Sequence, residues 1–425
     1  MSIADSAGPR APRLHYGWVV AGATFLSGLI MAGAVGAPGI FIIPLQQEFG
    51  WSTSDISAAL AVRFFLFGII APFAAALMNK YGVRRIVLVA QSIVGASLIL
   101  SLWMTSLWQL LLLWGIGVGI GTGMTALVLG ATVATRWFAA RRGLVVGVLT
   151  ASVATGQLIF LPILTSLAVS YGWRTALVVV CVAVGCAAAI MALLMRDRPS
   201  DVGLLPYGHT GPAPVAPPPP VSVTAAAFGA LRDAARTKTF WILFGTFFIC
   251  GASTNGLIQT HFIPMCVDYG LTQTGAASLL AAIGVFDFFG TILSGWLSDR
   301  YNNRWLLFWY YGLRGLSLVF LPFTDFTFFG LSIFAVFYGL DWIATVPPTV
   351  KLTASTFGTE RANLVFGWIF AGHQMGAAIA AFAAGFSRTM LATYLPAFFV
   401  AGALCIVAAI VVLTIQERKP TPAPS

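Results

Sequence analysis

Four ionisable side chains lie inside long apolar stretches of this sequence: Asp287, Asp341, Arg314 and Arg63. A charge within a membrane helix costs at least about 2.5 to 3.5 kcal/mol on insertion scales, so each of them needs a partner or a function. A desolvated carboxyl group can take up a proton at one membrane face and release it at the other. An arginine presents a fork of N–H donors that fits both oxygens of a carboxylate. These residues therefore predict the binding of protons and of small anions.

Each of these groups also has a second, structural interpretation. We expect Asp287 and Asp341 to couple protons. Alternatively, Asp287 forms a permanent ion pair with Arg314 or Arg63, and Asp341 pairs with Arg314. Arg63 is the best available cation for a carboxylate substrate, and Arg314 is a further candidate. The alternative for Arg63 is a pair with Asp55, about two helical turns away, which is long for direct contact.

Uncharged polar and aromatic side chains in the same stretches extend the predicted substrate-binding set. Asn255 and Gln259 are four residues apart and therefore share one face of a helix. Either His261 or His373 could join a proton path near neutral pH, although a lone membrane histidine is more often a hydrogen-bonding packing residue. The extended set is Gln157, Asn255, Gln259, His261, Trp342, His373 and Gln374.

Membrane helices must position these residues. Hydrophobic residues make up 59% of the chain and charged residues 8%, and the mean hydropathy is +0.90, whereas a soluble domain is about 25% charged. A helix needs about 20 apolar residues to cross the bilayer core. Such stretches begin near residues 17, 55, 84, 107, 142, 173, 239, 273, 304, 326, 361 and 390. We predict an all-α membrane protein with twelve transmembrane helices in two pseudo-symmetric six-helix bundles.

The two halves match each other when one is shifted by 220 residues along the other. Gly36 then falls on Gly256, and residues 79–81 (NKY) fall on residues 299–301 (DRY). Internal duplication is typical of secondary transporters. A proline-rich segment between the halves cannot continue a helix. The predicted organisation is an N-terminal bundle at 1–195, a cytoplasmic linker at 196–238 with a short helix at 224–236, and a C-terminal bundle at 239–425.

Lysine and arginine are concentrated on one predicted side of the membrane. With the N-terminus inside, nearly all cationic loop residues are cytoplasmic, and only Arg174 and Arg388 are placed outside. The positive-inside rule then predicts a multi-pass protein of the cell inner (plasma) membrane with both termini cytoplasmic. The net charge of +10 fits this topology and contact with the lipid bilayer, and it makes nucleic acid a poor candidate partner.

Two of the helices are expected to be broken. Residues 36–39 (GAPG) lie in the first helix, and Pro347-Pro348 lies in the tenth. A proline removes a backbone donor and displaces the carbonyl four residues earlier, so the helix bends or opens. Transporters place substrate sites at such breaks. The glycines at 115–123 in the fourth helix are expected to serve close packing between helices.

The sequence predicts neither an enzyme nor a metal or cofactor site. The five cysteines fall in predicted helices without a CxxC spacing, and the four histidines are scattered along the chain. No HExxH segment, nucleophile elbow or phosphate-binding loop is present in the sequence.

Two loop segments carry a family resemblance. Residues 75–85 (AALMNKYGVRR) resemble the G-x-x-x-D-R-x-G-R-R motif of the major facilitator superfamily, and residues 295–304 (GWLSDRYNNR) form a second copy. The resemblance implies the major facilitator fold and a conformational latch at these loops. In the first copy, Ala75 and Asn79 replace the Gly and the Asp of the motif. The implied latch residues are Asn79, Lys80, Arg84, Asp299, Arg300 and Arg304.

Within the superfamily the chain is most similar to the monocarboxylate transporter group and the related oxalate and formate antiporters. In that group, an aspartate in helix eight and an arginine four residues later couple proton and carboxylate. Asp287 matches the aspartate, and Thr291 stands at the position of the arginine, where the resemblance implies a substrate contact. The segments that carry the similarity are 16–18 (YGW), 48–51 (EFGW), 137–138 (WF), 141–144 (RRGL) and 171–174 (YGWR).

The leading hypothesis is a monomeric secondary active transporter that moves a small organic anion, a monocarboxylate, by alternating access coupled to protons. The main alternative is a proton-antiport exporter of an amphipathic or toxic compound, which the aromatic content would suit. A non-transporting membrane receptor is a minor alternative, because no segment resembles a signalling domain.

Overall fold

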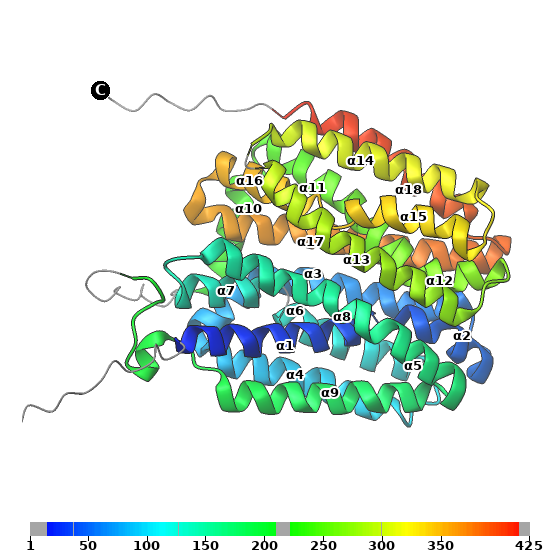
Figure 1. Cartoon of the computed structure of the whole chain (residues 1–425), viewed down its shortest axis with the longest axis horizontal. Coiled ribbons are helices and arrows are strands. Elements are labelled where there is room, and N and C mark those ends of the chain that lie inside the picture. The colour runs from blue at the N-terminus through cyan, green and yellow to red at the C-terminus, as the bar shows by residue number, and fades with distance from the viewer. Residues whose placement is uncertain (1–14, 37, 126, 210–221, 299, 416–425) are drawn as a thin grey trace, which may run out of the picture.

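The computed structural model describes residues 15–36, 38–125, 127–209, 222–298 and 300–415. These residues form helices almost throughout and no β-strand (Figure 1). Among them, eleven helices are long and apolar enough to cross a membrane. A twelfth, α8 (Arg142–Tyr171), has a shorter apolar part at Ile159–Tyr171 but runs beside α1 and α13 (Figure 1). The predicted all-α membrane fold is therefore confirmed.

The N-terminal half forms helices one to six. Helix one consists of α1 and α2, and helix four runs from α5 through a π-helical segment to α6 and α7. The elements are α1 (Tyr16–Gly36), α2 (Pro38–Phe49), α3 (Thr53–Tyr81), α4 (Val83–Ser101), α5 (Leu107–Leu110), η1 (Leu111–Val118), α6 (Gly119–Thr125), α7 (Leu127–Trp137), α8 and α9 (Trp173–Leu194).

The C-terminal half repeats this order as helices seven to twelve. Helix seven consists of α11, a π-helical segment and α12, and helix ten consists of α15 and α16. The elements are α11 (Lys238–Gly251), η3 (Ala252–Ile258), α12 (Gln259–Asp268), α13 (Gln273–Ser298), α14 (Asn303–Phe320), α15 (Phe328–Asp341), α16 (Val346–Phe357), α17 (Thr359–Leu391) and α18 (Leu395–Val412).

The linker between the halves is partly helical. A short 3₁₀ turn, η2 (Pro199–Val202), follows helix six, and α10 (Val223–Ala234) precedes helix seven. The short helix predicted at 224–236 is therefore present. Phe228 of α10 contacts Phe73 of α3 and Trp368 of α17. We call the membrane side that carries α10 the linker side; it lies at the left of Figure 1.

The two halves lie one above the other in Figure 1 and contact each other mainly through α3 with α17, α8 with α13, and α2 with α12. On the side opposite the linker the contact is close. Gln273 Nε2 donates a 2.9 Å hydrogen bond to the Ile40 carbonyl, and the Ser54 amide donates to Thr389 Oγ1 at 3.1 Å. Within the described residues, α7 and α16 on the linker side are not closely packed together. Helices one and seven therefore bring the halves together on the side opposite the linker, whereas the described parts of helices four and ten do not do so on the linker side.

Glycines allow the closest helix approaches. A Cβ at Gly39 would lie 2.7 Å from the Gln259 carbonyl oxygen, so helices one and seven meet there only because position 39 lacks a side chain. In helix four, Gly119 packs against the backbone of Arg63 in α3, whereas Gly121 packs against α4 at Ala90. The glycines of helix four thus separate onto two faces, as expected for residues that serve packing.

Equivalent turns in the two halves have the same unusual backbone. Gly50 and Gly270, which are 220 residues apart, end helices one and seven with φ angles of 69° and 90°. These angles lie in the left-handed region, which glycine adopts without the steric penalty that other residues meet. The duplication therefore extends from the sequence to the backbone conformation.

Candidate functional site

The site is organised around the break in helix ten, which comprises residues 342–345 between α15 and α16. The break precedes Pro347 and Pro348, as the prolines predict. Because Pro348 has no N–H, the carbonyl of Ala344 lacks its usual helical donor. The hydroxyl of Ser294 in α13 donates to that carbonyl at 2.5 Å. A side chain of helix eight thus replaces a backbone donor that helix ten has lost.

Arg314 stabilises the same break from α14. Its Nε donates to Asp341 Oδ2 at 2.7 Å, and its Nη2 donates to the carbonyls of Asp341 and Trp342 at 2.5 and 2.9 Å. Its Nη1 lies 2.9 Å from Cys250 Sγ in α11. Arg314 and Asp341 are both buried. The ion pair between Asp341 and Arg314, which is the structural interpretation of both residues, is formed.

Asp287 binds the break through a neutral donor. Its Oδ1 accepts a 2.8 Å hydrogen bond from the backbone nitrogen of Ile343 and a 3.0 Å hydrogen bond from the hydroxyl of Thr291. The side chain is buried, and none of the ion pairs within the described residues involves it. The permanent ion pair considered for Asp287 with Arg314 is not formed. Thr291 instead uses its hydroxyl to orient Asp287.

Asp341 keeps one oxygen without a hydrogen-bond partner. Whereas Oδ2 is held by Arg314, Oδ1 is buried and has no partner within the described residues. An orphaned buried acceptor is costly unless it takes up a proton or a ligand. Asp341 and Asp287 therefore both lie at one helix break, one paired with a cation and the other not in an ion pair among the described residues.

The polar residues of helices seven and eleven lie where these helices pack together. The Nε2 of His261 lies 2.8 Å from the Ala381 carbonyl, and its ring is 5.2 Å from that of Tyr394. His373 lies against Phe247 and Phe370, with ring centroids 4.8 and 5.7 Å away. Both histidines are buried, and their Nδ1 atoms have no partner within the described residues.

The amides of this region differ in exposure. Gln259 and Gln374 are buried, whereas Asn255 in the π-helical segment of helix seven is half-buried. The Asn255 carbonyl accepts a 2.7 Å hydrogen bond from the hydroxyl of Thr260. Trp342 is buried beside Tyr338 in helix ten. The side chain of Gln157 lies outside the described residues.

Arg63 is 2% exposed, and its guanidinium carbon is 5.0 Å from the centre of the Phe64 ring. Asp55, the alternative partner considered for it, is engaged elsewhere. Its carboxylate accepts hydrogen bonds from the backbone and hydroxyl of Ser52 at 3.0 and 2.7 Å and caps the start of α3. The pair between Arg63 and Asp55 is therefore not formed, and Arg63 is a buried cation of α3.

The first copy of the loop motif uses a carboxylate that lies outside the motif itself. Asp197, just after helix six, accepts a 2.9 Å hydrogen bond from the Arg84 amide at the start of α4, and Arg136 donates to the Asp197 carbonyl at 3.3 Å. Lys80 is exposed, with its Nζ 5.5 Å from the centre of the Tyr81 ring. The Asn79 side chain lies outside the described residues. Asp197 thus places a negative charge at a helix N-terminus, which is favourable.

In the second copy of the motif, Asp299 lies outside the described residues. Arg300 is exposed and stacks on Trp296, with its guanidinium carbon 4.0 Å from the ring centre. Arg304 donates a 2.7 Å hydrogen bond to the Ile415 carbonyl just beyond α18. Arg304 therefore ties the start of helix nine to the end of helix twelve.

Two ion pairs on the side opposite the linker use acidic residues at equivalent places in the halves, with arginines from helix six in one half and helix eleven in the other. Glu48 at the end of helix one pairs with Arg174 at 2.6 Å, and Asp268 at the end of helix seven pairs with Arg388 at 2.7 Å. Glu48 and Asp268 are 220 residues apart. Burial raises the pKa of Glu48, but hydrogen bonds from Arg174 and Trp173 outweigh it, and the pKa lies below its usual value. Each pair fixes the end, opposite the linker, of a helix that contacts the other half.

Metal ligation has no support in the described part of the chain. No group of three or more His, Cys, Asp or Glu side chains in those residues is arranged to hold a metal ion. Buried carboxyl, guanidinium, imidazole and amide groups inside membrane helices can bind protons and polar solutes, which is chemistry suited to transport.

The sequence profile of the Major Facilitator Superfamily matches residues 24–381 and, in a second match, residues 262–425. The chain is 24% identical over 393 residues to the MFS-type transporter YcxA of Bacillus subtilis (strain 168), a match that covers 91% of each chain. It is 26% identical over 409 residues to monocarboxylate transporter 13 of Rattus norvegicus, covering 95% of this chain and 89% of the relative.

The fold is also similar to a solved structure. The crystal structure of a bacterial homolog of the human lysosomal transporter Spinster, in an inward-facing and unoccupied conformation, matches with a TM-score of 0.69 at 17% identity. The match covers 97% of this chain and all of that structure. With the profile match across both halves, the chain belongs to the Major Facilitator Superfamily.

Proposed function

We propose that this protein is a proton-coupled secondary transporter of a small organic anion, a monocarboxylate, and that it works by alternating access as a monomer. Relatives named monocarboxylate transporters, which match along most of the chain, support the substrate class. The observation that carries the proposal is Asp287, a buried carboxylate without an ion-pair partner among the described residues, in contact with the break in helix ten.

Asp287 is the proposed proton site. An ionised carboxylate in a membrane interior is costly without a cation, so taking up a proton relieves that cost. Its Oδ1 accepts a hydrogen bond from the Ile343 backbone, and a charged acceptor forms a stronger bond than a neutral one. Proton binding therefore weakens the bond that connects helix eight to helix ten. This bond provides the link between protonation and the shape of the break.

Asp341 has a second, related role in this proposal. Its Oδ1 has no partner among the described residues, whereas Arg314 holds Oδ2 and two carbonyls of the break. We assign Arg314 to positioning the break, because all of its described hydrogen bonds serve helix ten or Cys250. Asp341 can then accept a proton or a substrate donor on Oδ1 while Arg314 keeps its hydrogen bond to Oδ2.

Arg63 is the proposed cation for the carboxylate of the substrate. Its position in α3, a helix that packs against α17 of the other half, lets it respond when the halves move. Arginine can bind both oxygens of a carboxylate. Position 291 supplies no cation in this chain, because threonine is uncharged. The Thr291 hydroxyl donates its hydrogen bond to Asp287 instead. The polar residues proposed to line the path are Asn255, Gln259, His261, His373, Gln374, Gln157 and Trp342.

The proposed cycle rocks one half against the other. In the structure the halves contact each other closely on the side opposite the linker, through Gly39 and Gln273. The proposed location is the cell inner membrane. In the proposed orientation the linker side and both termini face the cytoplasm, because the linker-side loops carry most of the Lys and Arg residues. The structure then corresponds to a form closed toward the outside.

The test is proton entry into proteoliposomes that contain a pH-sensitive dye. Lactate, pyruvate, formate, oxalate and larger aromatic acids are added in turn, with protein-free liposomes as the control for passive entry of undissociated acid. Saturable internal acidification with one class of acid is the expected result. No protein-dependent acidification with any acid, from protein shown to be folded, would contradict the proposal and favour an exported substrate.

A further inference from the structure

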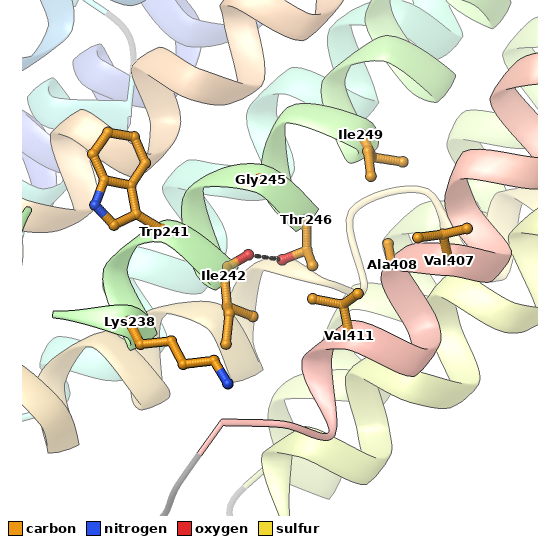
Figure 2. A pocket seen from close by; sticks show the side chains of 9 residues that line it. All are labelled: Lys238, Trp241, Ile242, Gly245, Thr246, Ile249, Val407, Ala408 and Val411. Carbon is orange, nitrogen blue, oxygen red and sulfur yellow. Dashed lines mark hydrogen bonds between the residues drawn. The ribbon is translucent and has the colours of Figure 1, made fainter.

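A groove lies between helices seven and twelve in their linker-side half. Its walls are formed by α11, from Lys238 to Ile249, and by α18, from Val407 to Val411 (Figure 2). The cavity measures about 300 Å³. The helix rises by about 16 Å from Lys238 to Ile249, roughly half of the 30 Å hydrocarbon core and therefore about the depth of one leaflet.

The groove opens toward the membrane and offers hydrocarbon contacts. Trp241, Val407 and Val411 on its walls are 55%, 51% and 37% exposed, so no other helix covers them. The hydroxyl of Thr246 is satisfied within its own helix by the Ile242 carbonyl at 2.8 Å (Figure 2). Because its remaining surface apart from Lys238 is apolar, the groove suits an acyl chain and is a poor site for a polar solute.

One end of the groove carries positive charge. Lys238, the first residue of α11, is exposed, and its side chain extends along the mouth of the groove (Figure 2). Arg236, two residues earlier, is also exposed. The N-terminus of α11 adds the positive end of a helix dipole. Trp241 bonds through Nε1 to the Ala235 carbonyl at 2.8 Å, an arrangement suited to the membrane interface.

We propose that this groove binds one anionic phospholipid, with an acyl chain against Gly245 and Ile249 and the phosphate at Lys238. Basic pockets between transmembrane helices are known to recognise anionic head groups. The groove thus offers one lipid both an apolar surface for its acyl chain and a positive charge for its phosphate. The proposal is independent of the transported substrate, because the groove faces the lipid and lies outside the network at the helix-ten break.

The experiment is native mass spectrometry of the purified, delipidated full-length protein titrated with phosphatidylglycerol or with phosphatidylcholine of the same acyl chains. We expect one tightly bound phosphatidylglycerol and an affinity about fivefold above that for phosphatidylcholine. Lys238→Gln should remove this preference. Lys80→Gln, which changes another exposed linker-side lysine, should leave it intact.

A second variant tests the apolar part of the site. Nothing lies within 4 Å of a Cβ placed on Gly245, so Gly245→Leu can fill the groove without a clash at its first carbon. It should abolish tight binding of phosphatidylglycerol, whereas Gly185→Leu in α9, where a Cβ also meets nothing within 4 Å, should not. Equal binding of both lipids by the wild type, or an unchanged preference in Lys238→Gln, would overturn the proposal. Should Gly245→Leu fail to fold, the Lys238→Gln comparison decides alone.

Discussion

Asp287 Oδ1 lies 2.8 Å from the backbone nitrogen of Ile343, so a carboxylate of helix eight completes the hydrogen bonding of a break in helix ten. In an unbroken helix that nitrogen would donate to the carbonyl four residues earlier. Together with Ser294 and Arg314, Asp287 supplies the break with side-chain partners from two neighbouring helices. A protonation event at one side chain can therefore alter the conformation of a neighbouring helix.

Asp287→Asn should separate proton coupling from substrate exchange. Asparagine keeps an oxygen for the Ile343 and Thr291 donors, so the break is expected to persist, but it cannot take up and release the proton. We expect uphill uptake driven by a pH gradient to be lost while exchange of internal for external substrate continues. Both are measured with labelled substrate in proteoliposomes, and Asp325→Asn, at an exposed loop position, serves as the control. Uphill uptake by Asp287→Asn would refute the role.

Arg314→Gln should destabilise the C-terminal half strongly. The substitution leaves the Asp341 carboxylate buried without its cation and removes the donor to two carbonyls. Breaking a buried ion pair costs about 3 to 5 kcal/mol. We therefore expect a clear fall in the thermal unfolding temperature of the detergent-solubilised protein. Arg300→Gln, at an exposed arginine, should leave that temperature almost unchanged; equal effects of the two variants would contradict the assignment of Arg314.

The Glu48–Arg174 pair should stabilise the protein only while Glu48 is ionised. Since the folded-state pKa of Glu48 is depressed, its contribution is present above the unfolded-state pKa and is lost as the pH falls through the folded-state value. The pair is partly exposed, so we expect no more than about 1 kcal/mol. Thermal unfolding of wild type and Glu48→Gln should differ at pH 7 and converge toward pH 3. A difference that persists unchanged at pH 3 would argue against the ion pair.

Gly39→Val should disturb the closed side of the protein. A Cβ at position 39 would lie 2.7 Å from the Gln259 carbonyl, so helices one and seven must separate there. We expect slower transport and faster labelling of the buried Cys266 on α12 by a membrane-impermeant maleimide, quantified by peptide mass spectrometry. Gly22→Val, where nothing lies within 4 Å of a Cβ, is the matched control. Unchanged labelling of Cys266 would contradict a close contact at Gly39.

The helices could be predicted from the sequence because the bilayer imposes one length and one composition on all of them. The break in helix ten was also predictable, since two adjacent prolines remove two donors. The π-helical segments in helices four and seven could not be predicted, because no residue type signals the wider hydrogen-bonding pattern of a π-helix. Their existence depends on how neighbouring helices pack.

The candidate site was only partly predictable. Burial cost identifies the charged residues Asp287, Arg314 and Asp341, but not which carboxylate the arginine selects. That choice depends on how the three helices are rotated relative to one another, and no short segment of the sequence indicates this rotation. Asp197 is a similar case, because it contacts the start of α4 from 113 residues away in sequence. Tertiary contacts of this kind decide whether a buried charge is structural or available for transport.

Proton coupling at Asp287 is tested most directly by the accumulation of a labelled monocarboxylate in proteoliposomes under an imposed pH gradient, acid outside. We expect accumulation above the external concentration that requires the protein, collapses with a protonophore and is absent in Asp287→Asn. Protein-dependent accumulation that persists after the protonophore, or that Asp287→Asn retains, would contradict proton coupling at Asp287.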